Sequence, residues 1–320
     1  MLPHDSWYRL LSRRPCISKR ARLLYLACLL FFGEMRLGAS SPPQGARHPR
    51  PSQSQNRSLY SLKLRFSEGQ VTNYRIDIVY SLRRAGKAQP LYTLRETLME
   101  RVQVQKVRPD GSAELSFVVT SGAGLFNGKA FEVNASEAPM YCVVAPNGAV
   151  VSSPPSKGKV VSPQMPDFLQ RATNLYGLLF PSYPLALGQH WSYHEAEGNT
   201  TACLAEMRQV GPYQTLLLKS LSVISIHTFV HTSDSPSAEG DPNSVSGMIL
   251  RGKLRLRSST DFAPQLGLCV RIVKHGWADL QVRTVVNKPS KQNQNTPATL
   301  VLPPPVHMLA TFEISAGIVG

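Results

Sequence analysis

Two pairs of histidines have the spacing that a zinc site uses on a helix: His190 with His194, and His227 with His231. Both pairs lie in stretches where apolar and polar residues alternate, which is typical of β-strands. On a strand, four residues extend about 13 Å, too far for two imidazoles to bind one ion. We therefore predict structural or surface histidines, no metal ligands and no cofactor.

Catalytic signatures are also missing from the sequence. The stretch Ser121–Gly128 is rich in glycine, but no helix pattern follows that could direct its N-terminus at a phosphate, so we predict a hairpin or bulge. Neither Gly-x-Ser-x-Gly nor His-Glu-x-x-His occurs. Acidic residues are sparse, and we identify none paired in an apolar setting that would tune a general acid. No catalytic residue is predicted, and a non-enzyme is favoured.

One group of basic residues has a clear geometric meaning. Arg251, Lys253, Arg255 and Arg257 alternate with Leu254 and Leu256, so on a strand all four bases point to one face. They are candidates for contact with an anionic envelope surface, such as lipid headgroups or wall polymer. The alternative is a solvated sheet face. Binding of single-stranded nucleic acid would require aromatic residues among the bases, so no nucleic-acid partner is predicted.

Residues 1–39 have the pattern of an export signal. A basic stretch, Ser18–Arg22, precedes an apolar run of about ten residues, Leu23–Phe32. A signal peptide needs roughly seven to fifteen apolar residues and a membrane span about twenty. We expect a cleaved signal and an exported protein that is periplasmic, envelope-bound or extracellular; an uncleaved anchor remains open. Residues 40–58 are rich in Ser, Pro and Gln and are predicted to be a flexible linker.

The folded part is moderately basic and contains few cysteines. The signal carries seven Lys and Arg against two acids, and the linker adds three arginines, so the net charge falls from +15 to +7 without them. Cys142, Cys203 and Cys269 remain beyond the signal. This odd number allows at most one disulfide, and the spacing matches no zinc motif. The sequence settles neither the disulfide status nor the oligomeric state.

The chain beyond the linker is predicted to be mainly β (α+β). Alternation of apolar and polar residues in Tyr60–Phe66 and Tyr74–Tyr80, and an Asp110-Gly111 hairpin turn, indicate antiparallel curved sheets or half-barrels with one wet face. One segment, Pro166–Phe180, has helical spacing instead. It predicts a single amphipathic helix that packs on the sheet.

An internal echo indicates a duplication. Gly69-Gln70 with Tyr74 recurs 119 residues later as Gly188-Gln189 with Tyr193. The turn that ends at Gly148 recurs, also 119 residues later, in the turn that ends at Gly267. We predict similar halves over 59–157 and 183–287, a linker and helix over 158–182, and a C-terminal loop with a last strand over 288–320. Coincidence among common turn residues is the alternative.

The stretch Pro184–Tyr193, which follows the predicted helix, resembles uncharacterised bacterial secreted β-sheet families with two similar halves. In those families the second half begins with a sequence motif of the form Pro, apolar residue, Gly, polar residue, any residue, Trp. The predicted architecture is also similar to that of envelope lipoprotein carriers, whose curved antiparallel sheet wraps a helix and holds acyl chains. Neither resemblance assigns a functional residue.

The leading hypothesis is a non-enzymatic envelope protein that binds a lipid or another apolar or amphiphilic ligand between sheet and helix. Its predicted ligand-binding residues are Phe168, Leu175, Leu179 and Trp191, and Trp191 could equally be a core anchor. The first alternative is a structural or protein-interaction module of the cell envelope. The second is a hydrolase with dispersed site residues.

Overall fold

The computed structural model describes residues 58–135, 139–152, 178–195, 198–231, 246–286 and 304–319. Within these ranges every regular element is a β-strand. The predicted β-rich, antiparallel architecture is therefore confirmed. The predicted helix lies outside the described residues from 166 to 177, and Leu178–Phe180, at its expected end, have no regular structure. The predicted signal and nearly all of the linker also lie outside.

The first seven strands are β1 (Leu59–Tyr60), β2 (Val71–Arg84), β3 (Tyr92–Val107), β4 (Ala113–Phe126), β5 (Lys129–Val133), β6 (Met140–Val144) and β7 (Val150–Ser152). The remaining seven are β8 (Leu185–Ala186), β9 (His190–Glu195), β10 (Gly198–Val210), β11 (Tyr213–His231), β12 (Ser246–Ala263), β13 (Leu268–Val286) and β14 (Val306–Val319).

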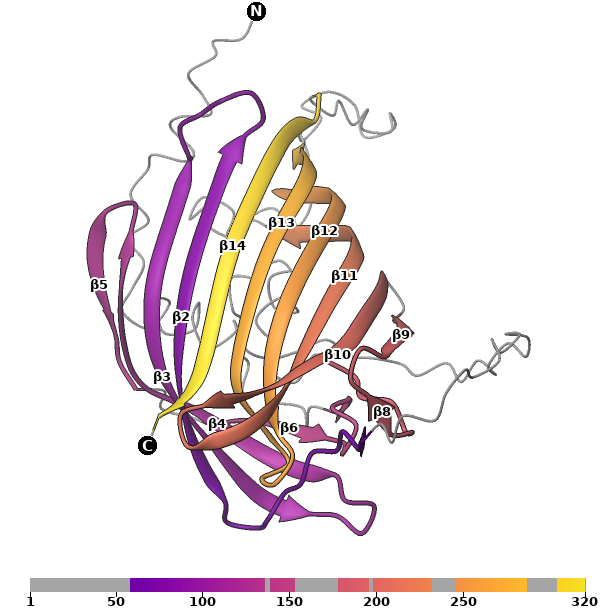
Figure 1. The fold of residues 1–320 in the computed structure, drawn as a ribbon. Coiled ribbons are helices and arrows are strands. Elements are labelled where there is room, and N and C mark those ends of the chain that lie inside the picture. The colour runs from indigo at the N-terminus through magenta and orange to yellow at the C-terminus, as the bar shows by residue number, and fades with distance from the viewer. Residues whose placement is uncertain are drawn as a thin grey trace, which may run out of the picture.

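One large antiparallel sheet contains twelve of these strands, in the order β7-β6-β4-β3-β2-β14-β13-β12-β11-β10-β9, with β5 paired to β4. The short strands β1 and β8 form a separate pair. The sheet curls strongly, so that it has a concave and a convex face, and it does not close (Figure 1). The last strand, β14, lies between β2 and β13 and so joins the N-terminal and C-terminal meanders into one sheet.

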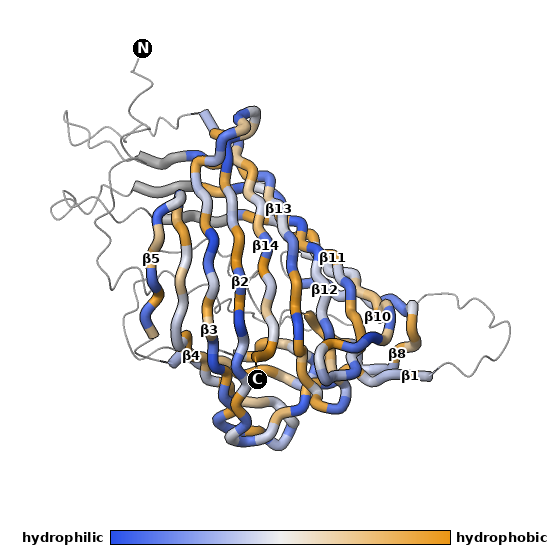
Figure 2. Tube along the Cα trace, turned by 60° about the vertical axis from the view of Figure 1, so that its left-hand side comes forward, coloured by the Kyte–Doolittle hydropathy of each residue, from blue (hydrophilic) through white to orange (hydrophobic). Residues whose placement is uncertain are grey.

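Alternation along each strand separates the two faces. On β2, Tyr74, Ile76 and Ile78 are buried while Arg75 and Val79 are exposed. Successive side chains of a strand point to opposite faces, so this pattern requires one dry and one wet face. Figure 2 shows the same alternation of hydrophobic and hydrophilic residues along the neighbouring strands. The prediction of one wet face rested on this periodicity.

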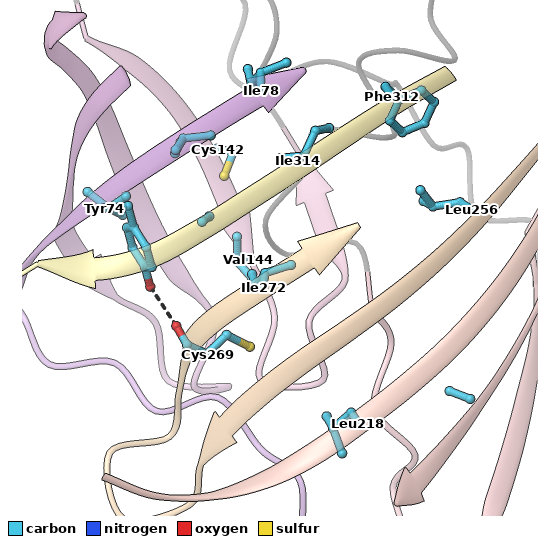
Figure 3. Close-up of a cluster of buried hydrophobic side chains, with 14 of the residues drawn as sticks. Tyr74, Ile78, Cys142, Val144, Leu218, Leu256, Cys269, Ile272, Phe312 and Ile314 are labelled. Carbon is cyan, nitrogen blue, oxygen red and sulfur yellow. Dashed lines mark hydrogen bonds between the residues drawn. The ribbon is translucent and has the colours of Figure 1, made fainter. Parts of the chain in front are cut away.

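The dry face packs into a continuous core. Figure 3 shows side chains of β2, β14, β13, β12 and β11 gathered with Cys142 and Val144 of β6. The phenolic O–H of Tyr74 donates a hydrogen bond to the carbonyl oxygen of Cys269 at 3.2 Å. This bond links β2 to β13 across the intervening strand β14 and satisfies the buried tyrosine hydroxyl.

The two echoed turns have matching geometry. Gly69 and Gly188 both have positive φ, 78° and 82°, a conformation that glycine adopts at little cost. The N–H of Gly69 donates to the carbonyl of Val104, and that of Gly188 donates to the carbonyl of Leu204. The two hydrogen-bonded turns are thus alike, and an ancestral duplication remains a prediction.

Candidate functional site

The concave face of the central strands is almost entirely apolar. Its buried side chains come from five strands that are consecutive in the sheet, in the order β3-β2-β14-β13-β12. They are Tyr74, Ile76, Ile78, Leu98, Val102, Leu254, Leu256, Ile272, Ala278, Leu280, Met308, Ala310, Phe312, Ile314 and Ala316. A surface of this composition favours hydrocarbon over water.

Two carboxylic acids interrupt this apolar face. Glu96 and Glu100 lie on β3 in the same register as Leu98 and are only 4% and 1% exposed. Among the described residues, none of their four carboxyl oxygens has a hydrogen-bond partner. An unsatisfied buried polar group costs about 1–3 kcal/mol, and more if it is charged. These two side chains are therefore the least satisfied groups of the described sheet.

Burial controls the protonation of both acids. Loss of solvent around the carboxylate raises the pKa of Glu96 and of Glu100 from 4.5 to about 8. Both side chains are accordingly protonated at neutral pH, and each presents one O–H donor and a carbonyl acceptor. The sequence reasoning missed this pair. The signal was available, because Glu96 and Glu100 share the period-two positions of Leu94, Leu98 and Val102.

A buried lysine lies on the same cross-strand line as Glu96. The line runs from Glu96 through Ile78 and Ile314 to Lys274 on β13. Three strand spacings separate its two ends, about 14 Å. Lys274 is 6% exposed, and desolvation lowers its pKa to about 8. The concave face thus places two acids on one side of an apolar strip and a buried amine on the other.

Hydroxyl side chains continue this polar line on β11 and β12. Ser258 lies opposite Lys274, and its hydroxyl is 2.5 Å from that of Ser220. Two residues further along β11, the hydroxyl of Ser222 forms a buried hydrogen bond with that of Thr200 on β10, at 2.7 Å. Within each pair the two hydroxyls satisfy each other by hydrogen bonding, whereas the carboxyls of β3 have no such partner among the described residues.

The histidines and cysteines do not assemble into a reactive centre in the described ranges, where no group of three or more metal-ligating side chains occurs. His190 and His194 are exposed on β9, and His194 contacts the side chain of Asn199. His227 is exposed on β11. Cys142, Cys203 and Cys269 are free thiols. Burial raises the pKa of Cys142 and Cys269 to about 12, so both stay protonated at neutral pH.

The structure places two of the four predicted ligand-binding residues. Trp191 is 6% exposed, and its indole N–H donates to the carbonyl of Leu179 at 2.8 Å. The side chain of Leu179 is half-buried. Trp191 and Leu179 are therefore neighbours within the packed structure. Phe168 and Leu175 lie outside the described residues.

The four predicted basic residues do lie together on the convex face. Arg251, Lys253, Arg255 and Arg257 are all exposed on β12. The guanidinium carbon of Arg257 lies 5.3 Å from the centroid of the Trp277 ring, within cation–π range. Next to these bases on β11, Leu221 and Val223 expose 43% and 38% of their surface. We call the four bases the β12 stripe.

Further cations surround the β12 stripe, while the nearby acids already have partners. Asp77 pairs with Arg75, Asp261 with Arg208, Asp279 with His307, and Glu313 with His275. Other exposed bases on the central strands are Arg83, Arg95, Arg101, Lys219, Arg271 and Arg283. The convex face of the described strands consequently has a strong excess of positive charge.

Comparisons with known proteins identify no relative from sequence. No protein family and no curated protein matches the chain. One similar solved structure is DynF from the dynemicin biosynthesis pathway of Micromonospora chersina, at 10% identity, TM-score 0.17, 87% of this chain and 92% of that one. Another is Salmonella typhi OmpF in complex with daunomycin, at 6% identity, TM-score 0.22, 78% of this chain and 98% of that one. Scores this low carry no argument about fold or function.

The described residues contain no helix whose length and hydropathy would let it span a membrane.

Proposed function

We propose that this chain is a non-enzymatic exported protein of the cell envelope that binds an apolar or amphiphilic ligand on the concave face of its curved sheet. The observation that carries the proposal is the combination of a continuous apolar face with two carboxyls that lack hydrogen-bond partners. A purely structural core gains nothing from Glu96 and Glu100, whereas a binding face uses a few polar groups to orient its ligand.

Small side chains on the concave face give the ligand a defined place. Ala278 of β13 and Ala310 of β14 are direct cross-strand partners, and both point to this face. Larger residues surround them, including Leu254 on β12 and Leu280 next along β13. The alanine pair therefore presents less side-chain volume than the residues around it. We place the apolar part of the ligand over this pair.

A matched pair of variants tests this position. Ala310→Leu adds a branched side chain to the concave face, and Thr311→Leu adds the same side chain to the convex face one residue away. The ligand for the titration is the neutral fluorescent hydrophobe N-phenyl-1-naphthylamine. Its affinity for A310L should be about tenfold lower than for the wild type, because the added side chain imposes a packing cost of about 1–3 kcal/mol. T311L should match the wild type. Absence of binding, or equal affinity in all three proteins, would contradict the proposal.

The convex face supplies the second part of the proposal, contact with an anionic envelope surface. The β12 stripe carries four bases at every second position, so about 20 Å of strand presents positive charge. Each base near an anionic bilayer contributes roughly 1 kcal/mol, and this contribution falls off within a Debye length. The flanking Leu221 and Val223 add exposed apolar area beside the charges.

Co-sedimentation with vesicles tests this contact. We expect binding to phosphatidylcholine vesicles that contain phosphatidylglycerol, little binding to phosphatidylcholine alone, and loss of binding in high salt. Replacing the β12 stripe by glutamine should weaken binding roughly a hundredfold or more. The control replaces four other convex bases by glutamine, namely Arg75, Arg83, Arg95 and Arg101. Equal losses in both variants would show that overall charge, and not the β12 stripe, attracts the vesicle.

A further inference from the structure

We infer that Glu96 and Glu100 anchor the polar end of the ligand, and that the ligand is an amphiphile with an amine headgroup. This inference rests on the proposed function and names the chemical class of the ligand. Both side chains are at least nine-tenths buried, and all four of their carboxyl oxygens lack partners in the described structure. A headgroup at this position meets acceptor oxygens on an otherwise apolar surface.

The surroundings of Glu96 suit a cation. Its cross-strand neighbours are Ile78 on β2 and Gly124 on β4. A Cβ at Gly124 would lie 2.6 Å from the ring of Phe131, so the glycine allows this aromatic side chain of β5 to pack here. A carboxyl close to an aromatic ring is a favourable combination for an alkylammonium, which gains an ion pair and a cation–π contact.

The direct cross-strand neighbours of Glu100 are uncharged. Its cross-strand neighbours are Tyr74 on β2 and Val119 on β4. Cys142 of β6 lies near enough for the two groups to influence each other, and it stays a neutral thiol. Lys274, the base on the same cross-strand line as Glu96, lies about 14 Å away across the sheet. Among the described residues, neither carboxyl therefore hydrogen-bonds to a base.

An amine satisfies these acids better than other headgroups. An alkylammonium brings three N–H donors and no acceptor, so it pairs with a carboxylate without leaving an orphaned group. When the ammonium form binds, the carboxylic acid loses its proton to solvent and the resulting carboxylate pairs with the ammonium. An anionic headgroup would prevent this ionisation, and a neutral hydroxyl would satisfy the oxygens without charge assistance.

Calorimetric titration of the wild-type protein with decylamine, decanol and decanoate at pH 7 tests the inference. The three probes share a chain length and differ in headgroup. We expect decylamine to bind at least about tenfold more tightly than decanol, and decanoate to bind more weakly than either. Repeating the decylamine titration in buffers of different ionisation enthalpy should show release of close to one proton per bound amine.

Glutamine variants locate the effect. Glu96→Gln and Glu100→Gln imitate the protonated acids in shape, and at least one of them should remove the preference for decylamine over decanol together with the proton release. Glu132→Gln, at an exposed position on β5, should change neither. If decylamine and decanol bind equally well without proton release, the inference fails while amphiphile binding stands. If none of the three probes binds, the proposed function itself fails. The wild-type comparison decides the matter even if a variant does not fold.

Discussion

The buried acids of β3 predict an unusual dependence of stability on pH. Burial raises the pKa of Glu96 and Glu100 from 4.5 to about 8. The folded protein therefore holds these protons more tightly than the unfolded chain does. Their contribution to stability is fully present below pH 4.5 and is lost as the pH rises through 8. Between these limits the free energy of unfolding should decrease.

The size of this decrease follows from the shift. One pKa unit corresponds to 1.36 kcal/mol, so a shift from 4.5 to about 8 gives roughly 5 kcal/mol for each acid. Two such losses would equal the whole stability of many domains. Water that enters around the ionised groups relieves part of this cost. We expect about 2–5 kcal/mol between wild type and Glu100→Gln at pH 8.5.

Urea unfolding followed by tryptophan fluorescence measures this difference. The wild type should lose stability steadily from pH 5 to pH 8.5 in the absence of amphiphile. E100Q should lose less over this range, because glutamine has no proton to release, and it should become the more stable protein at the alkaline end. Glu132→Gln, which alters an exposed side chain, should follow the wild type. Parallel curves for wild type and E100Q across the range would refute the reasoning.

Three further predictions concern other buried groups. Desolvation lowers the pKa of Lys274 from 10.5 to about 8, so the free energy of unfolding should be highest above pH 10.5 and should fall as the pH drops to 8. Lys274→Met should remove this loss of about 3 kcal/mol when urea unfolding is measured across that range. The same dependence of stability on pH in wild type and K274M would contradict this prediction. Arg208 donates two hydrogen bonds to the buried Asp261 at 2.5 and 2.6 Å. Arg208→Met should therefore destabilise the protein by about 2–4 kcal/mol in urea unfolding, whereas Asp261→Asn in the R208M background should recover part of this loss. A Cβ on Gly276 would overlap the ring of Phe312, so Gly276→Ala should lower stability by about 1–3 kcal/mol, and G276A combined with Phe312→Leu should melt above G276A alone.

Period-two alternation predicted the face on which side chains lie better than it predicted the strands. The segment Tyr60–Phe66 alternates and buries Leu62 and Leu64, yet it is a strand only as far as Tyr60. Alternation placed Leu254 and Leu256 on the buried face and the bases between them on the exposed face, as the structure does. Alternation is a local property, since each strand must bury one face whichever strand it pairs with. For the same reason it could not predict that β14 would pair with both β2 and β13.

The candidate site was harder to predict, because acids are usually exposed. Glu96 and Glu100 occur within Leu94–Val102, a segment that also contains arginines and a threonine, so the composition of this segment does not distinguish it from a solvated strand. Only their register with Leu98 placed them on the dry face. The burial of Lys274 was hidden in the same way, since only its spacing of two residues from Ile272 places it on the buried face of a strand with many polar residues. Charged residues are usually exposed, so only their register with buried apolar residues identifies the few that are buried.

The central claim is that the concave face holds a ligand, and native mass spectrometry of the protein purified gently from an envelope fraction tests it most directly. The account predicts an added mass that disappears after extraction with organic solvent, and an amine-bearing amphiphile in the extract. Masses that match only the bare chain or its multimers, even after incubation with decylamine and envelope lipids, would contradict it.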